Sequence, residues 1–145
     1  TSRNPADYEG AADEVVHADR MDEVFARSDA VVVALPGGEA TRGVVGARQL
    51  AALGAGWLVN VGRGSVVDED ALVAALTDGE LRGAGLDVFE TEPLPESSPL
   101  WGLPNVVMTP HVAGASPHYG RRLADLFVRN LAAFRGQGDW VNRVV

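Results

Sequence analysis

The stretch Asn60-Val61-Gly62-Arg63-Gly64 follows the apolar run Trp57-Leu58-Val59, which is typical of a buried β-strand. An arginine between two glycines at a strand end predicts a turn that presents a permanently charged guanidinium at the edge of a sheet. A planar guanidinium can bind a carboxylate through two parallel hydrogen bonds. Arg63 is therefore a candidate for binding a substrate carboxylate, and pairing with a nearby acid such as Asp68 is the alternative.

Two later stretches, Leu86 to Pro93 and Thr109 to Gly114, also begin as apolar runs and end in polar groups. The first carries the carboxylates Asp87 and Glu92, and the second carries His111. A histidine beside a carboxylate can donate and accept protons near neutral pH. The sequence therefore predicts a catalytic group of one arginine, one carboxylate and one histidine. The alternatives are a solvent-facing His111 and an Asp87 that only caps a turn.

Short apolar runs alternate with amphipathic stretches along the chain. The continuous β-branched runs predict strands buried on both faces, and helices between them predict an α/β fold with a doubly wound parallel sheet. Ligands of such sheets bind at the carboxyl ends of the strands. We expect strands at residues 14–17, 30–35, 57–61, 83–88 and 106–109, and helices at 22–27, 47–53, 69–77 and 117–135. Asp68 is predicted to cap the third helix, with Gly79 just past its end.

Composition restricts the kind of partner. The 145 residues suffice for one domain with a core. The net charge of −8 argues against nucleic acid, which binds clustered Lys and Arg, and no apolar run approaches the ~20 residues of a membrane helix. Without cysteine there is no disulfide or thiolate metal site, which fits a cytoplasmic location. We expect a small-molecule ligand, no metal, no nucleic acid and no membrane.

Three motifs in this order resemble those of the D-isomer-specific 2-hydroxyacid dehydrogenases. They are Asn60–Gly64 with Val67–Leu72, Gly85–Phe89 through Glu92-Pro93-Leu94, and Thr109-Pro110-His111. The resemblance covers nearly the whole chain and implies the C-terminal portion of a Rossmann-type dinucleotide-binding domain. It also implies an NAD(P)-dependent oxidoreductase, a homodimer, acting on small 2-keto or 2-hydroxy acids such as glyoxylate or hydroxypyruvate.

The resemblance implies a role for each matching residue. Arg63 would bind the substrate carboxylate and polarise the reacting carbonyl, and Glu92 would pair with His111, the acid/base. Asp87 would contact the carboxamide region of the nicotinamide. The other residues expected at the cofactor are Ser2, Arg3, Leu35, Pro36, Val61, Gly62, Arg63, His111, Ala113 and Gly114.

One part of the family pattern is missing. No three glycines in the chain have the Gly-x-Gly-x-x-Gly spacing of a dinucleotide phosphate loop. We therefore expect residues 1–116 to be a partial NAD(P)-binding domain without its first strand and Gly-rich loop, within a longer protein. Residues 117–136 would form a long crossover helix, and residues 137–145 a tail returning toward a substrate-binding domain outside the chain.

Arg3 bears on the choice of cofactor. At the end of the second strand of a dinucleotide fold, an acid binds the 2′-hydroxyl of NAD and an arginine binds the 2′-phosphate of NADP. If Thr1–Asn4 is that strand end, the arginine and the lack of an acid favour NADP over NAD. The alternative is an arginine in a turn before Pro5.

Two other functions share this scaffold. A formate dehydrogenase-like enzyme is expected to carry glutamine where this chain has Glu92. A dinucleotide-sensing corepressor keeps a similar set of polar residues and is separated only by an activity assay. We favour the 2-hydroxyacid enzyme.

Overall fold

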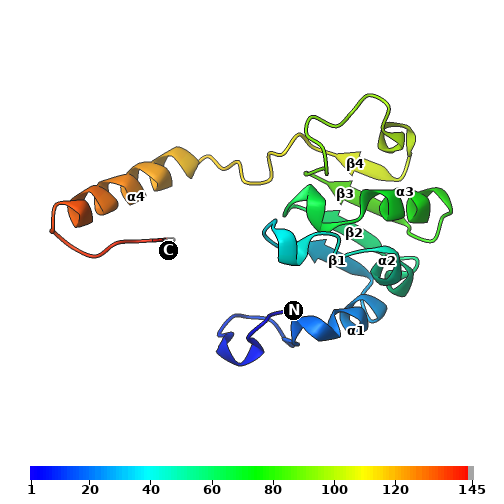
Figure 1. Ribbon diagram of the computed structural model, residues 1–145, viewed down its shortest axis with the longest axis horizontal. Helices are drawn as coiled ribbons and strands as arrows, with labels where there is room; N and C mark the ends of the chain where they lie inside the picture. Colours follow the sequence, from blue (N-terminus) through cyan, green and yellow to red (C-terminus); the bar gives the residue numbers. More distant parts are fainter. Residues whose placement is uncertain (144–145) are drawn as a thin grey trace. The chain divides into compact units, whose positions relative to one another are not determined.

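The computed structural model describes residues 1–143 and forms two compact units (Figure 1). The first unit is Thr1–Ala113, and the second begins at Gly114. Within the described residues, no helix combines the length and the apolar character that crossing a membrane requires.

The first unit is built on a sheet of four parallel strands in the order β1-β2-β3-β4. The strands are β1 (Ala30–Val33), β2 (Trp57–Asn60), β3 (Gly83–Leu86) and β4 (Val106–Met108). Because all four run in the same direction, their carboxyl ends share one edge of the sheet, and the predicted polar residues follow at that edge. The predicted parallel α/β fold of the Rossmann type is confirmed, although each strand is one to two residues shorter at its end than expected.

Three helices pack side by side, one before β1 and one in each of the connections β1–β2 and β2–β3 (Figure 1). They are α1 (Met21–Ala26), α2 (Ala47–Leu53) and α3 (Glu69–Thr77). Asp68 caps α3 as predicted, since its Oδ1 accepts a hydrogen bond from the backbone N–H of Ala71 at 3.0 Å. Gly79 follows with a positive φ of 73°. The core between helices and sheet is apolar, and its largest fully buried side chains include Leu50, Leu58, Leu72, Leu81 and Leu100.

The opposite face of the sheet is largely bare in the described residues. Val32, Val59, Gly85 and Val107 lie in one row across the four strands. Val32 is 64 % exposed and Val107 is 70 % exposed. The expectation of strands buried on both faces therefore does not hold for β1 and β4, because α1, α2 and α3 pack together against the other face.

The strand expected at residues 14–17 is reduced to a single bridge. Ser2 and His17 form an isolated parallel pair. The N–H of Ser2 donates to the carbonyl of Val16 at 3.0 Å, and the N–H of Ala18 donates to the carbonyl of Ser2 at 3.0 Å. With a single bridged pair of residues, residues 14–17 form no continuous ladder of backbone hydrogen bonds. The parallel direction nevertheless agrees with Thr1–Asn4 being a strand exit.

The second unit consists of α4 (Tyr119–Phe134) and the segment after it. The helix is two residues shorter at its start and one shorter at its end than predicted. Its predicted apolar face is largely exposed, with Phe127 at 67 %. The Asn130 side chain ties the following segment back, because its Nδ2 donates to the carbonyl of Val141 at 3.1 Å and its Oδ1 accepts from the N–H of Val141 at 2.9 Å. Residues 144 and 145 of the predicted tail lie outside the described residues.

The turn after β2 is held between the ends of its two neighbouring strands. A Cβ added at Gly62 would lie 2.6 Å from the carbonyl oxygen of Leu35, which follows β1. A Cβ added at Gly64 would overlap the carbonyl group of Phe89, which follows β3. The glycines on both sides of Arg63 are therefore required by close approach of the backbone on both sides.

We predict that Gly64→Ala destabilises the protein that contains this chain, because the new Cβ must displace the Phe89 backbone. Overpacking of this kind costs ~1–3 kcal/mol. Urea unfolding followed by circular dichroism measures the change. Gly102→Ala is the matched control, since nothing lies within 4 Å of its added Cβ. Equal stability of the two variants would contradict the prediction.

Candidate active site

The turn that carries Arg63 is braced by the side chain of Asn60. Asn60 is 1 % exposed; its Oδ1 accepts from the N–H of Gly62 at 3.1 Å and its Nδ2 donates to the carbonyl of Arg63 at 3.1 Å. The sequence did not predict this structural role of the Asn60 side chain, although a polar residue at the end of an apolar run was a signal for it. The amide therefore fixes the backbone from which the Arg63 side chain departs.

The Arg63 side chain is exposed, and its Nη1 donates to the carbonyl of Gly62 at 2.7 Å. Among the residues that the structure describes, Arg63 forms no ion pair, and the alternative of pairing with Asp68 is not seen. The carboxylate of Asp68 caps α3 instead. The remaining donors of the guanidinium are therefore available to an anionic ligand.

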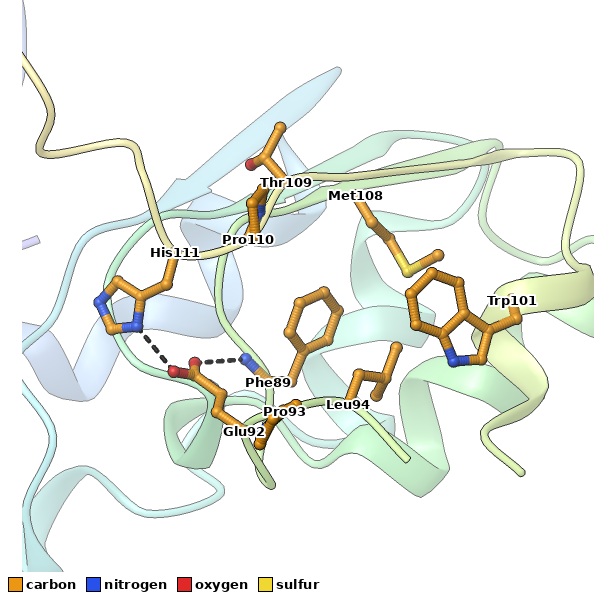
Figure 2. A pocket seen from close by; sticks show the side chains of 9 residues that line it. All are labelled: Phe89, Glu92, Pro93, Leu94, Trp101, Met108, Thr109, Pro110 and His111. Carbon is orange, nitrogen blue, oxygen red and sulfur yellow. Dashed lines mark hydrogen bonds and ion pairs between the residues drawn. The ribbon is translucent and has the colours of Figure 1, made fainter. Parts of the chain in front are cut away.

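Glu92 and His111 form the predicted pair (Figure 2). Glu92 Oε2 lies 2.7 Å from His111 Nδ1, and Glu92 Oε1 accepts from the N–H of Phe89 at 3.0 Å. The neighbouring Glu90 pairs with Arg42 at 3.2 Å, so Glu92 is the partner of the histidine. With Glu92 ionised, Nδ1 carries the shared proton. The other ring nitrogen, Nε2, points away from Glu92 in Figure 2 and is the atom that can exchange a proton with a substrate.

The Glu92 carboxylate is stabilised in its ionised form. The hydrogen bond from His111 lowers the pKa of Glu92 most, followed by the N–H of Phe89, and the charges of His111 and Arg63 act in the same direction. Glu92 is therefore a carboxylate at neutral pH. It orients the imidazole by accepting the hydrogen bond from Nδ1.

Asp87 joins the end of β3 to the loop after β4. The residue is 4 % exposed, and its Oδ1 accepts from Thr109 Oγ1 at 2.5 Å and from the N–H of Val112 at 2.8 Å. Its Oδ2 accepts from the N–H of Ala113 at 2.8 Å. The Thr109 hydrogen bond is the largest cause of a lowered pKa at Asp87, ahead of the two backbone donors and the charge of His111. Asp87 thus caps this loop, and its contact with a nicotinamide remains a prediction.

His111 itself has a left-handed backbone, with φ of 54°. Residues other than glycine rarely adopt this conformation. The N–H of His111 donates to the carbonyl of Asp87 at 2.8 Å and also contacts the carbonyl of Thr109 at 3.1 Å. The main chain and the side chain of Asp87 together hold this turn.

An apolar pocket of about 650 Å³ lies on one side of the Glu92–His111 pair (Figure 2). Its walls are Phe89, Glu92, Pro93, Leu94, Trp101, Met108, Thr109, Pro110 and His111. The indole Nε1 of Trp101 donates to the carbonyl of Pro95 at 2.9 Å and so closes residues 95–101, which follow the Glu92-Pro93-Leu94 stretch. In the figure, Nε2 of His111 points away from this pocket.

The predicted cofactor residues fall into separate places. Leu35 and Gly62 are in backbone contact, and Val61 and Pro36 are exposed beside them at the carboxyl edge. This apolar, exposed surface suits a nicotinamide or adenosine ring.

Ser2 and Arg3 lie on the bridge to His17, where Arg3 is exposed and Ser2 Oγ accepts from the N–H of Asn4 at 3.1 Å. An exposed arginine beside a hydroxyl fits a phosphate group. Gly114 opens the second unit, so its predicted contact stays a prediction. In residues 1–143, no three His, Asp or Glu side chains gather as metal ligands.

Comparison with known proteins gives a consistent result. The family described as "D-isomer specific 2-hydroxyacid dehydrogenase, NAD binding domain" matches residues 1–113. Glyoxylate/hydroxypyruvate reductase B of Yersinia enterocolitica is 45 % identical over 136 residues, which are 92 % of this chain and 41 % of that protein.

Two solved structures are similar over 99 % of the chain. An NADPH-dependent glyoxylate/hydroxypyruvate reductase from Sinorhizobium meliloti, in complex with NADP and malonate, aligns with a TM-score of 0.82 at 42 % identity over 44 % of that chain. A D-isomer specific 2-hydroxyacid dehydrogenase family protein from Aeromonas salmonicida aligns with a TM-score of 0.87 at 36 % identity over 46 % of its length. The chain thus spans less than half the length of these relatives.

The lowered pKa of Asp87 leads to a pH-dependent prediction. The folded state is favoured by the ionised carboxylate at pH above the unfolded-state pKa of ~3.9, and this contribution is lost as the pH falls through the lower folded-state pKa. Asp87→Asn should therefore lower stability at pH 7, and the difference from the wild type should shrink below about pH 4.

Urea unfolding of both proteins at several pH values between 7 and 3 measures this difference. Asp78→Asn, an exposed position after α3, is the control and should show no pH-dependent difference. A deficit for Asp87→Asn that is equally large at pH 3 and pH 7 would refute the role of the charge.

Proposed function

The chain belongs to the D-isomer specific 2-hydroxyacid dehydrogenases, and on that basis we propose that the protein containing it transfers a hydride between NAD(P)(H) and a small 2-keto or 2-hydroxy acid. The observation that carries the proposal is the Glu92–His111 pair at the same sheet edge as an unpaired Arg63. Glyoxylate and hydroxypyruvate, named for the relatives, are the proposed substrates.

In the proposed reduction, the guanidinium of Arg63 binds the substrate carboxylate and draws electron density from the adjacent carbonyl. His111 gives its Nε2 proton to the carbonyl oxygen, while Glu92 keeps the imidazole oriented and stabilises its charge. In the reverse direction the same nitrogen accepts the hydroxyl proton. The bound nicotinamide supplies the hydride chemistry.

The carboxylate at position 92 favours this reaction over that of a formate dehydrogenase-like enzyme, in which glutamine is expected there. A corepressor would keep the same dinucleotide contacts without turnover. A steady-state assay that follows NADPH oxidation with glyoxylate and with hydroxypyruvate separates these functions. Turnover supports the enzyme, and dinucleotide binding without turnover supports the corepressor.

We further propose that NADP is preferred to NAD. Arg3 is exposed at the end of a segment that pairs in parallel with His17. A relative at 42 % identity is described as NADPH-dependent. A homodimer, a cytoplasmic location and a division of the chain at residues 116 and 136 also remain proposals. Light scattering, cell fractionation and limited proteolysis, respectively, test them.

We predict that His111→Gln lowers kcat by ~10²–10⁴-fold, the usual contribution of a general acid/base. Cofactor affinity should be nearly unchanged, because the altered group acts on the substrate. His118→Gln is the control, since His118 is exposed and makes no side-chain cap at the start of α4. If His111→Gln kept most of its turnover on every 2-keto acid tested, the proton donor would be a different residue.

We predict that Arg3→Ala weakens NADPH binding and leaves NADH binding nearly unchanged. The loss should match a hydrogen bond to a charged group, ~1.5–3 kcal/mol, because only NADP carries a 2′-phosphate. The ratio of kcat/KM for the two cofactors, before and after the change, is the measurement. Arg82→Ala, an exposed arginine before β3, is a charge-matched control. A wild-type preference for NADH would be enough to reject the role of Arg3.

A further inference from the structure

The hydroxyl of Thr109 contacts the Asp87 carboxylate that holds the His111 turn, and it transfers no proton in the proposed reaction. Thr109 follows β4 directly, its N–H donates to the carbonyl of Leu86 at 2.9 Å, and its Oγ1 donates to Asp87 Oδ1 at 2.5 Å. That distance is typical of a strong hydrogen bond from a hydroxyl to a carboxylate. The Thr109 side chain is otherwise exposed, so it does not pack in the core.

The Asp87 carboxylate receives three donors, and they flank His111 in the sequence on both sides. Thr109 lies two residues before the histidine, and Val112 and Ala113 are the next two residues after it. Between them the chain must pass through the left-handed conformation at His111, with φ of 54°. The Thr109 hydrogen bond fixes how the carboxylate is rotated, and the carboxylate in turn fixes the N–H groups of Val112 and Ala113.

The direction of the imidazole depends on this arrangement. At the backbone position that the turn imposes, Nδ1 lies 2.7 Å from Glu92 Oε2. Glu92 is itself tied to the β3 exit by the N–H of Phe89. Glu92 and His111 are thus both held by residues that follow β3. Phe89 holds Glu92, and Asp87 holds His111.

We propose that Thr109 is a positioning residue for His111, acting through the carboxylate of Asp87 to set the imidazole against Glu92. The inference rests on the proposed function for its catalytic consequence. Its structural consequence, the alignment of the two side chains, does not depend on which reaction the site performs. This separates the two in experiment.

The test compares Thr109→Val with Thr109→Ser in the protein that contains this chain. Valine keeps the β-branched shape and removes the hydroxyl, whereas serine keeps the hydroxyl. We expect Thr109→Val to lower kcat by ~10–100-fold, the range reached when a reacting group is misplaced by a fraction of an ångström to 1 Å. The solvent deuterium isotope effect on kcat should rise, and Thr109→Ser should retain most of the turnover.

A second measurement is independent of activity. The proton shared by His111 and Glu92 should give a low-field imidazole N–H resonance in NMR spectra of protein labelled with ¹⁵N-histidine. The signal should persist in Thr109→Ser and weaken in Thr109→Val; if valine prevents folding, Thr109→Ala provides the same comparison.

Wild-type kcat and an unchanged resonance in Thr109→Val would overturn the proposal, as would loss of the resonance in Thr109→Ser. A wild-type protein that reduces no 2-keto acid would reject the proposed function, while the resonance would still decide the role of Thr109.

Discussion

The hydrogen bonds accepted by Asp87 connect the sheet to the chemistry. The carboxylate follows β3 and takes one hydroxyl and two backbone donors from the loop after β4, while its own carbonyl accepts the N–H of His111. A buried carboxylate without hydrogen-bond partners would cost free energy, so the Asp87 side chain stays bonded to the loop after β4. The same hydrogen bonds lower the pKa of Asp87. These contacts connect the left-handed turn at His111 to the end of β3.

The turn carrying Arg63 depends on a different constraint, which is steric. Gly62 lies against the backbone after β1 and Gly64 lies against the backbone after β3, and the Asn60 amide spans the turn between them. The arginine therefore leaves a rigid base although its own side chain is exposed. In such a site the charged guanidinium is exposed to solvent, whereas the backbone that carries it is held in place. This arrangement suits the recognition of a mobile anionic ligand.

Electrostatic interactions connect the turn that carries Arg63 with the Glu92–His111 pair. The charge of Arg63 contributes to the lowered pKa of Glu92, which places both groups in one field. The charge of the Arg63 guanidinium favours an anion beside it. Under the proposed function, this edge of the sheet would bind a substrate carboxylate next to a proton donor, in a chain whose net charge is −8. Local arrangement, and not overall charge, decides what this edge can bind.

Much of this could be read from the sequence, because local rules decide it. Helices α2 and α3 begin and end as predicted, since capping by Asp68 and the apolar periodicity act within a few residues. Arg63, Glu92 and His111 were recognised because parallel strands bring their ends to one edge. The same local rules overestimated the pairing at residues 14–17, because pairing depends on the neighbouring strand. They also overestimated the burial of Val32 and Val107, because burial depends on what packs against that face of the sheet.

Only the tertiary structure decided how the side chains are held. The brace by Asn60 and the bond from Thr109 to Asp87 across 22 residues both depend on strand register and on the direction of each side chain. The left-handed His111 is likewise set by hydrogen bonds between two segments, with the donors after β4 and the acceptor Asp87 after β3. Periodicity and spacing determine which groups reach the edge of the sheet. Their orientation there is a property of contacts between distant segments, which exist only once the strands have paired.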